Sequence, residues 1–173
     1  MNANTDKDFD FVISKYRKSL YKVAATFESD PDFLQDLHQD ILFAIWKAIP
    51  GFKNKSSLHT FIYRVAYNQA INHVTKSSKV IHNQNDSNDV DHLINNNISE
   101  PDHYTSLQLE GQMLIAMIRQ LPIVKRQLIT LSLEGFSYKE IAEISGLKLN
   151  NVAVQLTRTK QQLRKILENE YAK

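Results

Sequence analysis

The chain of 173 residues contains no cysteine and only four glycines, four prolines and one tryptophan. Without cysteine there is no disulfide framework, no thiolate nucleophile and no metal site built from thiolates. No apolar run approaches the roughly 20 residues that a membrane-spanning helix needs. The N-terminus, MNANTDKDFDF, is polar and acidic and lacks the basic and then apolar segments of a signal peptide. We therefore expect a cytoplasmic protein with no direct membrane insertion.

The residues that are present favour helices. The apolar fraction of 42% is sufficient for packed cores, and a chain of this length fits one domain of ordinary size or two small ones. The scarcity of glycine and of alternating β-branched runs predicts an all-α protein.

Charge divides the chain into three parts. Residues 80–104 contain no lysine or arginine and five acidic groups, whereas residues 1–79 and 105–173 carry net charges of +3 and +4. The acidic segment is also rich in asparagine and poor in apolar residues, so it buries too little surface to offset the entropy lost on ordering. The sequence therefore predicts two small helical domains, residues 1–79 and 105–173, joined by a flexible acidic linker at 80–104. Such a tether suits a protein that binds two separated sites at once.

The N-terminal block is expected to hold about four helices, three of which can be placed. Apolar residues over 9–27 have the spacing of one helical face. Asp30 and Pro31 then supply an N-cap and a proline at the first helical position. Pro50-Gly51 ends this second helix, and Ser57 is expected to cap a third, long helix.

The third helix has a polar face that allows two interpretations. The polar side chains of this face and of the basic loop before it are Lys53, Lys55, Arg64, Asn68, Asn72 and Thr75. One interpretation is a solvated helix surface. The other is contact with nucleic acid, in which basic groups neutralise phosphates and asparagine hydrogen-bonds base edges. Three aromatic residues, Phe52, Tyr63 and Tyr67, are then expected to stack on unpaired bases.

The C-terminal block has a helix-turn-helix pattern, preceded by two helices of which the second spans roughly 123–133. Ser137 and Glu140 form an S-x-x-E capping box that begins a short helix. Gly146 supplies the tight turn, and Asn150 is expected to cap the next helix.

The outward face of that last helix is where DNA contact is expected. Its apolar residues, Val152 and Leu156, are placed in the core, which leaves Asn151, Gln155 and Arg158 facing outward. An αα-hairpin within a bundle is the alternative interpretation. The agreement of cap, turn and basic tail favours DNA binding.

Three segments, in chain order, resemble the extracytoplasmic-function (ECF) class of bacterial RNA polymerase sigma factors. The segment DLHQDILFAIWKAIPGF, from Asp36, is similar to the helix with which this family binds core polymerase. The segment SSLHTFIYRVAYNQAINH, from Ser56, is similar to the helix that melts and binds the downstream promoter element. The segment LPIVKRQLITLSLEGFSYKEIAEISGL, from Leu121, is similar to the family's final domain, which binds the upstream element. The resemblance covers nearly the whole chain.

This resemblance implies a protein that directs promoter-specific transcription initiation, with no catalytic residue, metal or cofactor. The implied partners are core RNA polymerase and promoter DNA, with an anti-sigma factor as a further, regulatory partner. The implied polymerase-binding residues are Asp36, Leu37, Gln39 and Asp40. The residues implied to recognise and melt the downstream (−10) element are Lys53, Lys55, Arg64, Asn68, Asn72 and His73. Those implied to recognise the upstream (−35) element are Asn150, Asn151, Gln155, Arg158 and Lys160.

The last helix departs from the family pattern. Ala153 and Gln155 occupy positions that are usually basic, whereas Arg158 and Lys160 keep their charge. We therefore expect this helix to bind DNA with fewer ionic anchors than is usual in the family.

Other classes of protein fit parts of the sequence. A helix-turn-helix transcriptional regulator would use the N-terminal block as a sensor domain and would need a ligand pocket there. An RNA-binding or helical adaptor protein is a further alternative. An enzyme is least favoured, because the six histidines show no metal-ligand spacing and three of them lie in the acidic segment.

Overall fold

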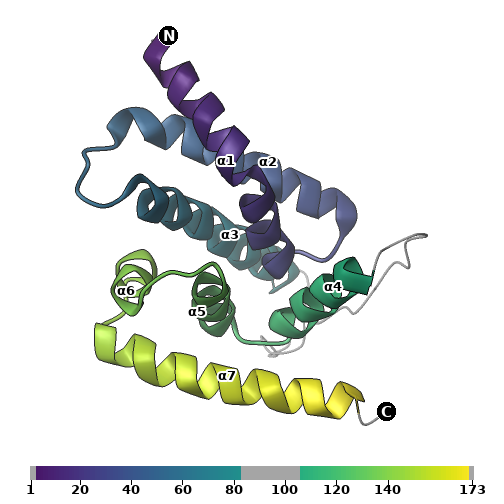
Figure 1. Ribbon diagram of the computed structural model, residues 1–173. Coiled ribbons are helices and arrows are strands. Elements are labelled where there is room, and N and C mark those ends of the chain that lie inside the picture. The colour runs from purple at the N-terminus through teal and green to yellow at the C-terminus, as the bar shows by residue number, and fades with distance from the viewer. Residues whose placement is uncertain (1–2, 83–105, 172–173) are drawn as a thin grey trace. The chain divides into compact units, whose positions relative to one another are not determined.

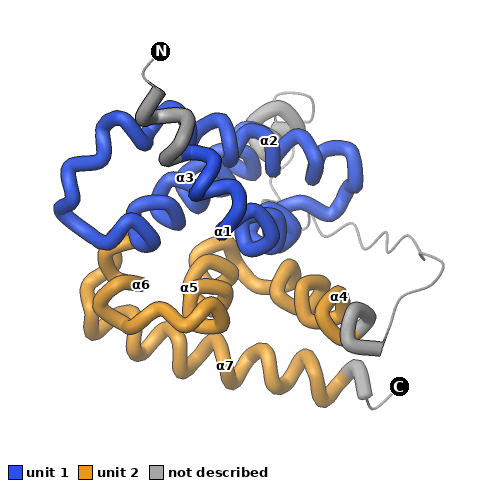
Figure 2. Tube along the Cα trace, turned by 45° about the horizontal axis from the view of Figure 1, so that its top comes forward, with its two compact units in different colours: residues 1–95 blue, residues 96–173 orange. Residues whose placement is uncertain are grey.

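The computed structural model describes residues 3–82 and 106–171, and within them every regular element is helical. The chain forms two compact units, residues 1–95 and 96–173, coloured blue and orange in Figure 2. The predicted all-α class is confirmed. The third helix continues to His82, into the segment expected as linker, and residues 83–104 of that segment lie outside the described residues.

Unit 1 contains three α-helices and one short turn of 3₁₀-helix. These are α1 (Ala3–Phe27), α2 (Pro31–Ala48), η1 (Ile49–Gly51) and α3 (Leu58–His82), and each α-helix packs against the other two (Figure 1). The three helices placed from the sequence are confirmed, and the fourth helical element of this unit is the 3₁₀ turn η1.

The predicted helix ends of unit 1 are confirmed by their hydrogen bonds. The carboxylate of Asp30 accepts from the backbone N–H groups of Asp32 and Phe33, at 3.0 and 3.2 Å. The hydroxyl oxygen of Ser57 accepts from the Thr60 N–H at 3.0 Å, one residue before α3 begins. These caps satisfy amide groups that the first turn of a helix leaves without partners.

The core of unit 1 includes two tyrosines that the sequence had placed on a DNA-binding surface. Tyr63 and Tyr67 are 1% and 0% exposed. Tyr63 meets the ring of Tyr16 edge-on with centroids 6.4 Å apart, and Tyr67 meets Phe27 in the same way at 5.9 Å. Because α3 packs against both α1 and α2, its buried arc is wider than a single apolar stripe. The expectation that Tyr63 and Tyr67 stack on bases was therefore wrong.

Unit 2 contains α4 (Ser106–Arg119), α5 (Ile123–Leu133), α6 (Tyr138–Ser145) and α7 (Leu149–Tyr171). Helix α7 runs along the other three and contacts each of them (Figure 1). The core residues Ile118, Leu121 and Ile129 pack against the partly buried Leu114, Leu163 and Ile166. The long helix α7 therefore gives one face to the core of unit 2 along much of its length.

The helix-turn-helix itself is formed by α6 and α7. The predicted capping box is confirmed, since the Glu140 carboxylate accepts from the Ser137 N–H at 2.9 Å and the Ser137 hydroxyl accepts from the Glu140 N–H at 3.3 Å. Gly146 adopts a left-handed conformation with φ 73°, which glycine takes without steric cost. The prediction that Asn150 caps α7 was wrong: the helix begins at Leu149, and the Lys148 carbonyl already accepts from the Val152 N–H at 3.1 Å.

Candidate functional site

The outer face of α2 carries two free-standing carboxylates. Asp36, Gln39 and Asp40 are exposed, and Asp36 and Asp40 lie one turn apart on the same face. Among the described residues neither aspartate forms an ion pair, and Asp40 accepts only a long hydrogen bond from Gln69, at 3.4 Å. Leu37, which was expected to join this surface, is fully buried and belongs to the core.

Exposed aromatic side chains lie at both ends of this acidic stripe. Phe33 and Phe43 are 59% and 57% exposed, at helical spacing from Asp36 and Asp40. Phe43 stacks on Trp46 with ring centroids 5.8 Å apart. Exposed aromatic side chains are enriched on surfaces that bind another protein. We did not expect the two phenylalanines from the sequence, although each lies three residues from the nearer aspartate.

His38 lies on the buried side of the same helix. Its ring meets Tyr21 edge-on at a centroid distance of 5.4 Å. Burial lowers the pKa of this histidine, with a smaller opposing effect from a hydrogen bond to the backbone of Arg17. The ring is therefore neutral at pH 7 and adds no positive charge beneath the acidic stripe.

The loop before α3 presents two lysines to solvent. Lys53, Asn54 and Lys55 are all exposed. Asn54 has φ 55°, a left-handed conformation that asparagine tolerates better than most residues. This turn reverses the chain after Phe52 and leaves both ammonium groups accessible to an anionic partner.

The polar face of α3 continues from this loop. Arg64 lies over the ring of Phe61 at 5.7 Å, and Phe61 in turn contacts Phe52 with centroids 4.9 Å apart. Asn68 and Asn72 are exposed on successive turns. The basic loop, Arg64 and the exposed amides of Asn68 and Asn72 therefore lie on neighbouring parts of unit 1.

His73 differs from the other residues of that predicted set. Its Nε2 atom lies 2.9 Å from a carboxylate oxygen of Glu28, and both side chains are only about one-fifth exposed. Glu28 also accepts from the backbone N–H groups of Ser29 and Asp30. His73 thus ties α3 to the loop between α1 and α2, which is a contact within unit 1.

The exposed face of α7 is set by its buried stripe. Val152 and Leu156 are fully buried, whereas Asn150, Asn151 and Arg158 are exposed. The remaining residues of the predicted upstream-element set lie at the flanks: Gln155 is half-buried, and Lys160 is exposed beside a groove on the other side of the helix.

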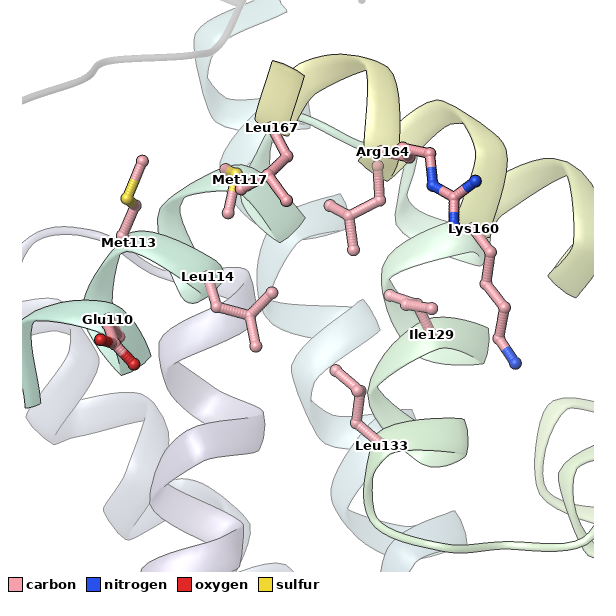
Figure 3. Close-up of a pocket in the computed structure, with 10 residues that line it drawn as sticks. Glu110, Met113, Leu114, Met117, Ile129, Leu133, Lys160, Arg164 and Leu167 are labelled. Carbon is pink, nitrogen blue, oxygen red and sulfur yellow. The ribbon is translucent and has the colours of Figure 1, made fainter. Parts of the chain in front are cut away.

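That groove is an apolar hollow of about 400 Å³ between α4, α5 and α7. Its apolar lining residues are Met113, Leu114, Met117, Ile129, Leu133, Leu163 and Leu167. Figure 3 shows Lys160 and Arg164 on one side of the hollow and Glu110 on the other. Leu133 is 56% exposed, so this lining remains open to a partner. Sequence reasoning missed the groove because it is assembled from three helices.

Two further features bear on the class of protein. Within residues 3–82 and 106–171, no group of three or more histidine, aspartate or glutamate side chains is placed to hold a metal ion. No helix in this part of the chain has the length and apolar character needed to cross a membrane.

Two family models match the chain, one in each unit. The Sigma-70 region 2 model matches residues 12–80, and the Sigma-70 region 4 model matches residues 111–163. The first covers the acidic stripe of α2 and the polar face of α3. The second covers α6, the first part of α7 and most of the residues that line the apolar groove.

Curated relatives align over almost the whole chain. The RNA polymerase sigma-H factor of Pseudomonas aeruginosa is 26% identical over 167 residues, which is 92% of this chain and 86% of the relative. The ECF RNA polymerase sigma-E factor of Escherichia coli is 26% identical over 165 residues, covering 90% of this chain and 84% of the relative.

Two solved structures share the fold. The sigma factor RpoE of Bartonella quintana, crystallised with the anti-sigma factor NepR, matches with a TM-score of 0.76 and 23% identity over 94% of this chain and 98% of the other. CnrH, in complex with the cytosolic domain of CnrY, matches with a TM-score of 0.67 and 17% identity over 95% and 90% of the two chains.

Proposed function

The chain belongs to the ECF family of RNA polymerase sigma factors, and from this premise we propose which part of the chain performs each step of transcription initiation. As a sigma factor it binds core RNA polymerase and directs initiation at specific promoters. The regulator with an N-terminal sensor domain is not favoured, because the block that would be the sensor matches Sigma-70 region 2. We assign residues 1–79 to polymerase binding and the downstream element, 80–104 to the linker, and 105–173 to the upstream element.

Polymerase binding is assigned to the outer face of α2. Asp36, Gln39 and Asp40 are exposed and available to basic groups of a partner. Phe33 and Phe43 add apolar surface at the two ends of this stripe. Leu37 contributes by holding α2 in the core, so that its neighbours face outward.

Recognition and melting of the downstream element are assigned to the loop and polar face of unit 1. Lys53 and Lys55 are placed to neutralise phosphates, and Asn68 and Asn72 are placed to hydrogen-bond bases that have left the stack. Arg64, which lies over the ring of Phe61, adds positive charge between the two lysines of the loop and the two asparagines of α3. His73, which is about one-fifth exposed, is assigned to the edge of this DNA-binding face, where it also holds α3 to the preceding loop through Glu28.

Recognition of the upstream element is assigned to the start of α7 in the major groove. The exposed amides of Asn150 and Asn151 lie in the first turn, where they can reach base edges. Arg158, two turns further on, is placed to meet a phosphate. Gln155 and Lys160, at the two flanks of the helix, are assigned contacts at the edges of the same site.

An anti-sigma factor is proposed as a regulatory partner. Two sigma factors that share this fold were solved in complex with partners, one of them named as an anti-sigma factor. The open apolar groove of unit 2, with Lys160 and Arg164 at its edge, suits an amphipathic segment that carries acidic groups. Asn150 and Arg158 do not line the groove, whereas Lys160 borders both the groove and the proposed DNA site.

The observation that carries the proposal is that each unit matches its own sigma-70 region and presents a free polar face there. The test is selection of promoters from a random DNA library by this protein with core polymerase, followed by run-off transcription. We expect two sequence elements at a fixed spacing and transcripts that require the added chain. Transcription no more specific than that of core polymerase alone would contradict the proposal.

A further inference from the structure

Val154 lies at the centre of the outward face of α7. At about 100° per residue, it is roughly 200° around the helix from the fully buried Val152, and so on the opposite side. Its side chain is 49% exposed. Gln155 lies one residue on, only about 60° from the buried stripe, and is half-buried. The residue best placed to meet a surface in front of α7 is therefore a valine and not the neighbouring glutamine.

The polar surroundings of Val154 set it apart from ordinary exposed apolar residues, which are common on protein surfaces. Asn150, one turn before it, and Arg158, one turn after it, are both exposed. A β-branched residue at an exposed helical position also contributes less to helix stability than alanine would. Leu149, the other exposed apolar residue of this region, lies about 60° from the buried stripe and thus at a flank.

The major groove of DNA contains an apolar group that a single exposed valine can contact. Thymine presents a C5-methyl group there, and side-chain methyl groups contact it favourably. From Asn150 to Arg158 the helix rises about 12 Å, which corresponds to about three to four base pairs. Val154 lies midway along this rise.

We propose that Val154 recognises one thymine of the upstream promoter element through its methyl groups. This inference rests on the proposed function of unit 2, in which the start of α7 enters the major groove. It assigns to Val154 the preference for an A·T pair at the middle of the contacted bases. The asparagines then specify bases at one end, and Arg158 anchors the phosphate backbone.

The test removes one methyl group from the DNA and the corresponding methyl groups from the protein. Upstream elements selected by the wild-type holoenzyme are prepared with each thymine in turn replaced by deoxyuridine, which lacks only the C5-methyl. At one position we expect the replacement to weaken wild-type binding about three- to five-fold, the effect of one buried methyl group. The Val154→Ala holoenzyme should bind the thymine and deoxyuridine probes equally well.

Val124→Ala is the matched control. Val124 is 48% exposed and lies on α5, so this variant makes the same change at the same exposure outside the outward face of α7. It should keep the wild-type penalty for deoxyuridine. Circular dichroism of Val154→Ala should match that of the wild type, because alanine favours the helix.

The outcomes separate this inference from the proposed function. Two results would overturn the role of Val154 if specific upstream binding is still seen. One is that Val154→Ala loses as much affinity as the wild type when thymine is replaced by deoxyuridine. The other is that the wild type loses no affinity on this replacement at any position. Failure of the wild-type holoenzyme to bind any upstream element specifically overturns the proposed function of unit 2 itself.

Discussion

Reversing both charges on the outer face of α2 should weaken the binding of core RNA polymerase and leave unit 1 folded. Asp36 and Asp40 are exposed, without ion pairs among the described residues, and the hydrogen bond from Gln69 to Asp40 is long at 3.4 Å. Surface substitutions of this kind usually change the free energy of unfolding by no more than about 0.5 kcal/mol each. Leu37→Ala, on the buried side, should by contrast cost about 2–5 kcal/mol.

The loss of binding follows from the charge change. An exposed ion pair with a basic group of the polymerase is worth about 0.2–1 kcal/mol, and arginine at the same position replaces that attraction with a comparable repulsion. Asp36→Arg with Asp40→Arg should therefore cost about 1–4 kcal/mol, which is about 5- to 1000-fold in Kd. The effect should shrink at high salt, because these charges are solvent-exposed.

The assay is a titration of labelled protein with core polymerase at two salt concentrations, with thermal unfolding measured in parallel. Asp10→Arg with Glu168→Arg is the matched control, since it makes the same net charge change at exposed positions of α1 and α7. Normal core binding by a well-folded Asp36→Arg, Asp40→Arg variant would refute the assignment. An equal loss in the control would show that net charge, and not the α2 face, governs binding.

Three further predictions test the other surfaces. Asn68→Ala should reduce permanganate-detected promoter melting and only slightly weaken closed-complex binding; the reverse pattern would contradict its assignment to unpaired bases. Arg158→Ala should weaken binding to all promoters alike and lower the salt slope by about one, whereas a changed sequence preference would place this residue at a base. Because burial lowers the folded-state pKa of His38, the unfolded chain takes up its proton first as the pH falls. Stability should therefore decrease below about pH 6.5, and His38→Leu should flatten that decrease in chemical denaturation.

The elements that could be predicted from the sequence are those fixed by neighbouring residues. The Asp30 cap with Pro31, the Ser137–Glu140 box and the turn at Gly146 each involve groups within a few positions of one another. Their chemistry is therefore visible as a short motif, and the structure confirms it. The beginning of α7 could not be derived in this way, because Lys148 begins the helix through its backbone carbonyl and lacks a capping side chain.

The burial of Tyr63 and Tyr67 depends on packing that no short motif encodes. Helix α3 contacts α1 on one side and α2 on another, so residues outside its main apolar stripe also enter the core. The apolar groove of unit 2 has the same origin, since Met113, Leu133 and Leu167 come from three different helices. Sequence periodicity predicts the buried face of a single helix, and it cannot show which residues of different helices lie next to one another.

Several proposed binding residues are exposed and lie next in sequence to a residue that is fully buried in the core. Leu37 is fully buried beside the exposed Asp36, and Tyr67 is fully buried beside the exposed Asn68. Successive residues on a helix differ by about 100° in direction, so the packing of the buried neighbour fixes where the functional side chain points. The same relation holds on α7, where the buried Val152 and Leu156 leave Val154 opposite the core. A core substitution that rotates one of these helices by a single position would therefore exchange a binding group for an apolar one without changing any residue of the surface.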